Sequence, residues 1–128
     1  MSSSIADRIE IEQLLARYTH AADIHPPEAM RDIFAADGRF HIEAMGIDVR
    51  GLDNIIHFFT EMRSQMAGMY HINTNLVVDI DGHTATAISY LSTLQSGPEP
   101  KIVSFSRYED DLVKTPGGWR IQSRSIDM

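Results

Sequence analysis

The sequence predicts one α+β domain, a cone-shaped α+β barrel in which N-terminal helices and a curved antiparallel sheet enclose a pocket. Three observations support this prediction. Helical periodicity dominates the first half of the chain, hairpin-connected strands fill the second half, and 128 residues suit a single hydrophobic core spanning residues 1–128. Helices that cover one face of a curved sheet leave a pocket between the two layers.

The first helix is expected from Ile5 to about Asp23. Its apolar stripe repeats at 3.6-residue spacing and comprises Ile11, Leu14, Leu15, Tyr18 and Ala22. Ser4 is the predicted N-cap, with Asp7 as the acidic residue of a capping box. Pro26 and Pro27 follow directly and predict the end of this helix.

A second, short helix is expected from Pro27 to about Ala35, since proline suits the first helical turn. The residues Ala-Asp-Gly at 36–38 predict a turn into a strand over 39–45. A short strand and turn follow, and then a third helix from Leu52 to Gln65. Its apolar side comprises Ile55, Ile56, Phe58, Phe59 and Met62.

The rest of the chain predicts four strands. The first three span Met69–Asp81, His83–Leu94 and Ile102–Lys114, and the last spans Trp119–Ile126. Gly- and Pro-rich turns separate them. Because the strands follow one another directly, hairpin pairing is expected.

Composition excludes several classes of function. The net charge of −7 and the pI of about 5.2 argue against nucleic acid and anionic membranes, which need clustered Lys and Arg. There is no apolar run of about 18 residues and no signal-peptide pattern at the N-terminus. Cysteine is absent, which removes thiol chemistry. We therefore expect a cytoplasmic protein without nucleic-acid or membrane partners.

Familiar catalytic motifs are missing too: the sequence has neither a Gly-rich phosphate loop nor a Gly-x-Ser-x-Gly elbow. His20, Asp23 and His25 lie close in sequence, but residues five apart do not share a helical face and prolines follow. We expect no metal and no cofactor.

Histidines, carboxylates and tyrosines beside apolar residues remain as candidates for chemistry. A histidine with a carboxylate partner is a general-base pair, and a tyrosine hydroxyl can stabilise developing negative charge. His71, Asp23 and Tyr18 are the candidates. Each also has a simpler interpretation: a strand-end histidine, a solvated helix-end aspartate and a core tyrosine.

Strand alternation raises a difficulty for His71. Strict alternation places it with Asn73 and Asn75, opposite the more apolar face that carries Ile72 and Leu76. Two solutions remain open. The apolar face packs against another subunit, or a bulge near Asn73 re-aims the side chains.

Three segments together resemble a known family: "IEIEQLLARYTHAADIHPPEAMRDIFAADGRF", "HINTNLVVDIDGHTATAISYL" and "RYEDDLVKTPGGWRIQSRSI". They resemble the SnoaL-like branch of the nuclear transport factor 2-like superfamily over nearly the whole chain. The resemblance is to the group of scytalone dehydratase, bile acid 7α-dehydratase and hexachlorocyclohexane dehydrochlorinase. Ketosteroid isomerase and polyketide cyclases are further relatives.

The resemblance implies specific site residues. In that group an Asp near the end of the first helix pairs with the His of a His-x-x-x-Asn strand, which here are Asp23, His71 and Asn75. Tyr18 matches a tyrosine of the bile acid dehydratase type, and Arg124, five residues after the last-strand Trp, also has a counterpart. The family also implies a homodimer or homotrimer formed through the outer sheet face.

The expected function is that of a cofactor-independent lyase of the dehydratase type, or an isomerase, acting on a small hydrophobic cyclic compound. His71 would remove a proton, Asp23 would orient it, and Tyr18 with Arg124 would stabilise negative charge. The expected substrate-binding residues are Phe34, Phe40, Phe58, Phe59, Met62, Asn75, Leu91 and Phe105.

A non-catalytic small-molecule-binding or oligomerisation module of the same fold is the alternative, because fold does not determine function. An accessory subunit of an oxygenase is less favoured. The dehydratases continue past the last strand into a covering segment, whereas this chain stops at Met128. We therefore expect a pocket that is open or is covered by a neighbouring subunit.

Overall fold

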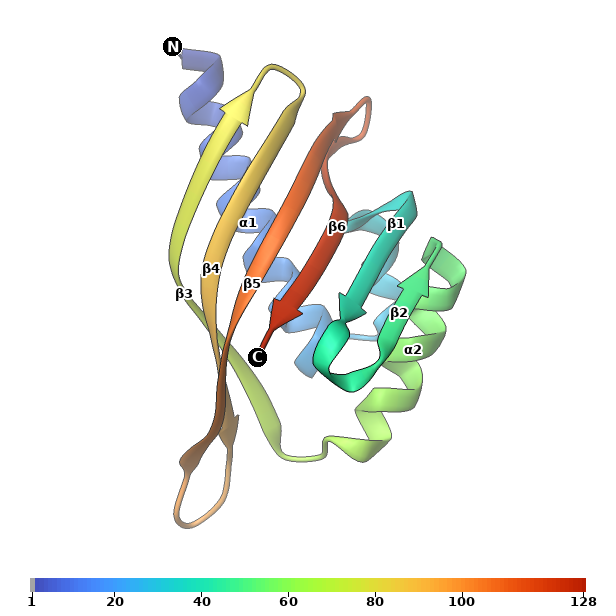
Figure 1. The fold of residues 1–128 in the computed structure, drawn as a ribbon, viewed down its shortest axis with the longest axis vertical. Coiled ribbons are helices and arrows are strands. Elements are labelled where there is room, and N and C mark those ends of the chain that lie inside the picture. The colour runs from blue at the N-terminus through green and yellow to red at the C-terminus, as the bar shows by residue number, and fades with distance from the viewer. Residues whose placement is uncertain (1) are drawn as a thin grey trace.

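The structure is a computed structural model that describes residues 2–128, and two layers are visible in it (Figure 1). A six-stranded sheet forms one layer, and the two α-helices lie on one face of it. The elements are α1 (Ser2–Asp23), η1 (Pro27–Asp32), β1 (Phe34–Ile42), η2 (Glu43–Met45), β2 (Ile47–Arg50), α2 (Leu52–Gln65), β3 (Met69–Asp81), β4 (Thr84–Gln95), β5 (Lys101–Thr115) and β6 (Gly118–Asp127). Within residues 2–128, no helix is both long and apolar enough to cross a membrane.

The strand order in the sheet is β2-β1-β6-β5-β4-β3. The α+β class is confirmed, but the expectation of a fully antiparallel sheet is wrong at one pair. β1 and β6 run parallel, while the other neighbours are antiparallel. The three hairpin-linked pairs of the second half end with β6 beside β1, and a long connection through α2 allows that parallel pairing.

The apolar stripe of α1 faces the sheet and forms the centre of the core. Ile11, Leu14 and Tyr18 are almost fully buried there, against Trp119 and Ile121 of β6. Helical periodicity therefore identified the buried side of α1 correctly.

The N-terminus of α1 differs from the prediction. The helix includes Ser2, so Ser4 lies inside it and is not its N-cap. The Asp7 side chain accepts hydrogen bonds from Trp119 Nε1 at 3.0 Å and from Lys114 Nζ at 2.9 Å. Asp7 thus ties α1 to β5 and β6 instead of serving a capping box.

This contact predicts a pH dependence of stability. The hydrogen bond from Trp119, and to a smaller extent the one from Lys114, holds the pKa of Asp7 below its usual value. The carboxylate therefore contributes stability that is complete above its unfolded pKa and is lost as the pH falls below about 4. The difference in Tm between wild type and Asp7→Asn should be constant from pH 5 to 7 and should shrink below pH 4. Asp79→Asn, on an exposed part of β3, is the control that should not reproduce this pattern.

The segment that enters the sheet also differs from the prediction. η1 ends at Asp32, and Phe34 and Ala35 belong to β1, as does the predicted turn at 36–38. Ile121 donates its backbone N–H to Ile33 O at 2.8 Å, and Phe34 pairs with Ile121. Pairing with β6 thus draws this segment into the sheet, and the small residues form the irregularity between Phe34 and Arg39.

A bulge in β3 resolves the alternation difficulty. The register with β4 shifts between Thr74 and Val77, and Asn75 adopts a positive φ of 58°. Before the bulge, His71 is on the inner face of the sheet, and after it Val78 is the buried residue. Because the bulge inserts one residue, the polar His71 and Asn73 face inward before it and the apolar Val78 and Ile80 face inward after it.

The bulge makes Asn75 sensitive to substitution. Asparagine tolerates the left-handed region better than other residues with a side chain. We expect Asn75→Ala to lower the free energy of unfolding by about 1 kcal/mol, and Asn75→Gly to change it by less than about 0.5 kcal/mol. Urea unfolding measures both. Equal losses for alanine and glycine would mean that backbone strain is not the cause.

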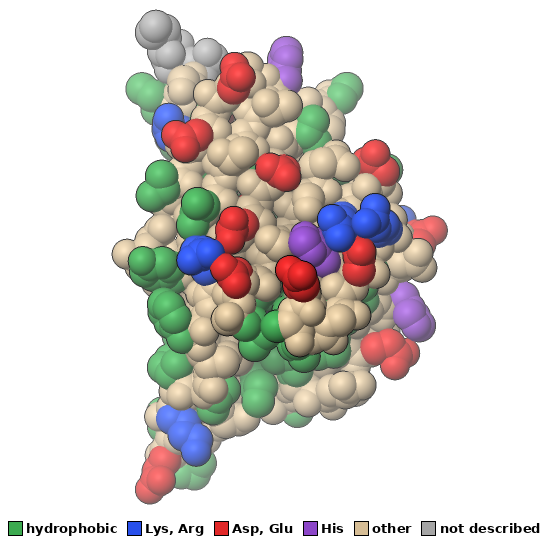
Figure 2. Space-filling view, in the orientation of Figure 1, with side chains coloured by type: hydrophobic (Ala, Val, Ile, Leu, Met, Phe, Trp, Pro, Cys, Tyr) green, Lys and Arg blue, Asp and Glu red, His purple; other side chains and the backbone are tan. Residues whose placement is uncertain are grey.

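The outer face of the sheet carries exposed apolar side chains, and Figure 2 shows hydrophobic residues gathered along the β3–β4 side of the molecule. Tyr90 and Phe105 contact each other there, with ring centroids 5.4 Å apart. The apolar outer face is defined by Tyr70, Ile72, Val77, Ile88, Tyr90 and Phe105. Both features considered for the orientation of His71, a bulge in β3 and an apolar outer face, therefore occur in the structure.

Candidate functional site

A cavity of about 440 Å³ lies between the helices and the inner face of the sheet. Its size is in the range of small-molecule sites. Aromatic rings make one wall, formed by Phe40 of β1, Phe58 and Phe59 of α2, and Tyr18 of α1. Neighbouring centroids are 5.2 Å apart for Phe40–Phe59 and 5.8 Å for Tyr18–Phe59. This packing gives the cavity a rigid apolar wall.

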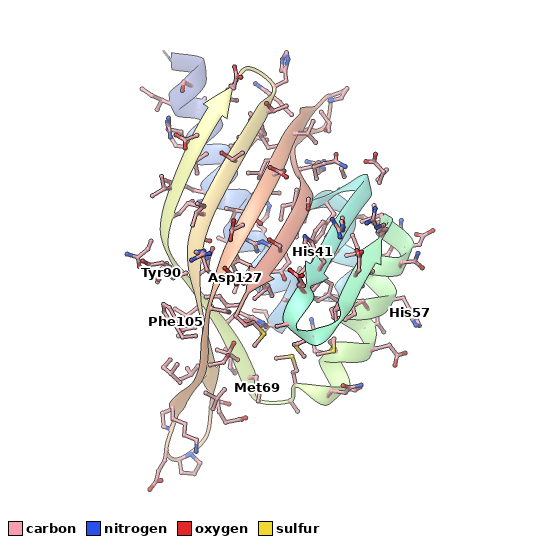
Figure 3. The ribbon with its side chains drawn as sticks, in the orientation of Figure 1. His41, His57, Met69, Tyr90, Phe105 and Asp127 are labelled. Carbon is pink, nitrogen blue, oxygen red and sulfur yellow. The ribbon has the colours of Figure 1, made fainter. Side chains whose placement is uncertain are left out.

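Methionines contribute much of the remaining apolar surface, and sulfur atoms gather between α2 and the sheet near Met69 (Figure 3). The lining methionines are Met45, Met62, Met66, Met69 and Met128. Their unbranched side chains adjust to the shape of a ligand more readily than branched ones. The cavity thus combines a stiff ring wall with an adaptable thioether wall.

Asp23 and His71 meet at the edge of this cavity. His71 Nδ1 lies 2.5 Å from Asp23 Oδ1, and the His71 backbone N–H donates to Asp23 Oδ2 at 2.9 Å. A carboxylate only accepts hydrogen bonds, so the proton of the neutral ring lies on Nδ1 and Nε2 is left as an acceptor. Both side chains are largely buried, with exposed fractions of 6% for Asp23 and 16% for His71.

The position of Asp23 depends on the end of α1. Arg63 of α2 donates to Ala21 O at 2.8 Å and to His25 O at 2.6 Å, and more weakly to Ala22 O at 3.3 Å. These carbonyls belong to the last turn of α1 and the loop after it, where a cation is favourable. Arg63 thereby fixes the helix end that presents Asp23 to β3.

Tyr18 contributes its ring to the cavity wall and is almost fully buried. Burial raises the pKa of the Tyr18 phenol to about 12, although the charge of Arg124 acts in the opposite direction. The phenol is therefore protonated at neutral pH and can donate a hydrogen bond.

Arg124 is not in the cavity lining, which corrects its expected place beside the substrate. It forms a fully buried bidentate ion pair with Asp110, at 2.7 and 2.9 Å. Its guanidinium carbon lies 3.5 Å from the ring centroid of Tyr108 and 4.3 Å from that of Tyr18. Burial alone lowers the pKa of Arg124, but the Asp110 carboxylate outweighs it and raises the pKa. Arg124 thus packs against the ring of Tyr18 without lining the cavity itself.

The structure places five of the eight expected wall residues at the cavity. Phe40, Phe58, Phe59, Met62 and Leu91 lie in the cavity lining. Three other residues do not. Phe34 is core beneath Tyr18, Asn75 is at the exposed bulge, and Phe105 points out of the opposite face of the sheet. Strand alternation explains Phe105, since its neighbours Ser104 and Ser106 take the inner positions.

Sequence reasoning missed four polar residues of the lining: Arg63, Thr93, Ser104 and Ser106. Alternation with Leu91 could have identified Thr93, which occupies the same face of β4. Arg63 had no comparable signal, because only the packing of α2 against the end of α1 brings it to the cavity.

Comparison with known sequences gives a consistent result. The profile of a family described as "SnoaL-like domain" matches residues 3–125. Uncharacterised proteins of Mycobacterium tuberculosis and Mycobacterium bovis are 31% identical over 129 aligned positions, covering 95% of this chain and 85% of theirs.

Solved structures agree in fold. A nuclear transport factor 2-like protein with a cystatin-like fold from Novosphingobium aromaticivorans superposes with a TM-score of 0.88 at 25% identity, over 97% of this chain and 82% of its own. A Mycobacterium tuberculosis protein of unknown function gives 0.87 at 25% identity, over 98% and 73%. A Novosphingobium aromaticivorans protein provisionally named an aromatic ring hydroxylase gives 0.84 at 29% identity, over 97% and 90%.

Proposed function

Because this chain belongs to the family of SnoaL-like domains, we propose that it is a cofactor-independent lyase of the dehydratase type, or an isomerase, acting on a small hydrophobic ring compound. The observation that carries the proposal is the 2.5 Å contact between Asp23 and His71 at the wall of an apolar cavity. The ring-related name of one structural relative supports a cyclic ligand.

His71 is the proposed general base. Asp23 accepts a hydrogen bond from the Nδ1–H of His71, which keeps that proton on the ring. The Nε2 lone pair is therefore free to accept a proton from a carbon acidified by a neighbouring carbonyl. The carboxylate then stabilises the imidazolium that forms, as in other histidine–carboxylate pairs. The apolar rings around the site strengthen this electrostatic interaction by lowering the local dielectric constant.

Tyr18 is the proposed hydrogen-bond donor. Its pKa of about 12 keeps the phenol protonated, so it can donate to an oxygen on which negative charge develops. In an elimination, the C–H electrons form the new double bond and the C–O bond breaks. The departing hydroxide takes up the proton that His71 removed and leaves as water, so His71 ends neutral and Tyr18 keeps its own proton. In an isomerisation, His71 returns the proton to another carbon of the same ring.

A binding module without catalysis is the competing proposal. A dyad separated by more than about 4.5 Å with no cavity beside it would favour that alternative, since proton transfer needs hydrogen-bond reach. The observed contact and cavity favour the enzyme. A thermal-shift screen of cyclic carbonyl compounds, followed by turnover assays on the hits, tests the choice. Hits that bind but are never converted would favour the binding module.

We also propose that the apolar outer face joins copies of this chain into a homodimer or homotrimer. Phe105 is 63% exposed and Val77 is 64% exposed, and such a contiguous apolar surface is typical of an interface. Phe105→Glu should reduce the mass measured by sedimentation to that of one chain of 14.4 kDa. Ile9→Glu, at an exposed apolar position of α1, should not. A wild-type protein that sediments as a single chain would contradict the proposal.

A further inference from the structure

The sheet wall of the cavity carries hydroxyl groups without partners. Thr93 and Ser106 are only 7% and 6% exposed, and both lie in the cavity lining. Between residues 2 and 128, no hydrogen bond joins either hydroxyl to another group. The fully enclosed side-chain atoms without a partner in that part of the chain are Tyr108 Oη and Arg124 Nη1. The Thr93 and Ser106 hydroxyls are therefore open to the cavity.

Strand register places Thr93 beside the proposed base and Ser106 next to Thr93 on the same face. Thr93 of β4 pairs directly with His71 of β3, and Ser104 of β5 pairs with Thr93. His71, Thr93 and Ser104 thus form one row across three strands, with neighbouring strands about 4.8 Å apart. Ser106 lies diagonally from Thr93 on the same face, at a distance of about 7–8 Å between Cα atoms.

The α2 wall opposite this row is mainly apolar. Phe58, Phe59 and Met62 of α2 line the same cavity and offer no hydrogen bonds. Arg63 of α2 also lines it, but its guanidinium donates to the carbonyl oxygens at the end of α1 and in the loop that follows. A buried hydroxyl without a partner is unfavourable, so an oxygen-free ligand would leave Thr93 and Ser106 unsatisfied. A ligand with an oxygen on the edge that faces the sheet would satisfy them.

We propose that Thr93 and Ser106, with Ser104 beside them, form a hydrogen-bonding subsite for a hydroxyl or carbonyl oxygen on the ligand ring. This subsite orients the ring with its opposite edge towards α2 and brings a defined ring carbon to His71. The inference rests on the proposed function in taking the cavity as the ligand site, but it concerns binding and not proton transfer. It selects oxygenated ring compounds over hydrocarbons of the same shape.

The test compares two probes of equal shape, 2-naphthol and 2-methylnaphthalene, by titration calorimetry or fluorescence. Wild type should bind 2-naphthol more tightly. The double variant Thr93→Val with Ser106→Ala should lose about tenfold in affinity for 2-naphthol and should keep its affinity for 2-methylnaphthalene. Thr86→Val is the matched control, because Thr86 is exposed on the outer side of the same strand.

Each outcome separates this subsite from the proposed reaction. An unchanged ratio of the two affinities in the double variant would overturn the subsite, and so would a wild type that binds neither probe. A lower affinity for both probes, with an altered Tm, would indicate a packing defect and would also count against it. Whether His71 transfers protons is decided separately by turnover, so failure of the subsite leaves that question untouched.

Discussion

Replacing His71 with alanine is expected to lower kcat/KM on a substrate found by screening by about 10²–10⁴-fold, the usual contribution of a general base. The ligand should still bind, because the aromatic and methionine walls remain in place. Asp23→Asn should give a loss of similar size. An amide both donates and accepts, so it no longer selects the tautomer with the proton on Nδ1.

The matched control for this prediction is His57→Ala. His57 is exposed on α2, and its side chain points away from the cavity (Figure 3). This variant should retain wild-type kcat/KM. The double variant with both His71→Ala and Asp23→Asn should lose little more than either single variant, because the two residues act as one unit. Turnover that survives His71→Ala unchanged would refute the mechanism.

Removing the Asp110 carboxylate is expected to produce the largest loss of stability. Asp110→Ala leaves the guanidinium of Arg124 buried without a counter-charge, where both side chains have an exposed fraction of 0%. Breaking such a pair costs about 3–5 kcal/mol of the free energy of unfolding. Urea unfolding followed by circular dichroism measures this loss. Because Arg124 packs over Tyr18, ligand affinity should fall as well.

Two comparisons make this prediction specific. Asp48→Ala breaks the half-exposed pair of Asp48 with Arg39, where the Nε–Oδ1 distance is 2.9 Å, and should cost at most about 1 kcal/mol. The double variant Asp110→Leu with Arg124→Met should be more stable than Asp110→Ala alone, since it leaves no uncompensated charge. Equal losses for Asp48→Ala and Asp110→Ala would contradict this account.

Much of the fold could be predicted from the sequence, because its signals are local. The bounds of α2 and β3 match the predicted ranges, and the apolar stripe of α1 is the buried one. The short helix after Pro27 ends at Asp32, earlier than the predicted end near Ala35, because Phe34 pairs with Ile121 and enters the sheet. Phe34 and Ile121 are 87 positions apart in the sequence (121 − 34), so no local sequence pattern predicts their pairing.

The candidate site also contains residues that the sequence predicts and residues whose position only the structure shows. Residue type and position predicted Asp23, His71 and Tyr18 as candidates, the family resemblance pointed to the same three, and the structure brings Asp23 and His71 into contact. Arg124 was identified from the same resemblance, yet Asp110 holds it behind Tyr18. A buried guanidinium needs a carboxylate, and the partner that supplies it was not evident from the sequence.

The sequence by itself determined the class of the fold, the positions of most elements and the identity of the histidine–carboxylate pair. These features follow from periodicity, turn residues and family pattern, all of which are properties of sequence order. Only the tertiary structure decided which way the side chains point. The bulge at Asn75 turns His71 towards the cavity, and strand register sets Thr93 beside it. Orientation depends on long-range pairing, because one inserted residue reverses every side chain that follows it in a strand.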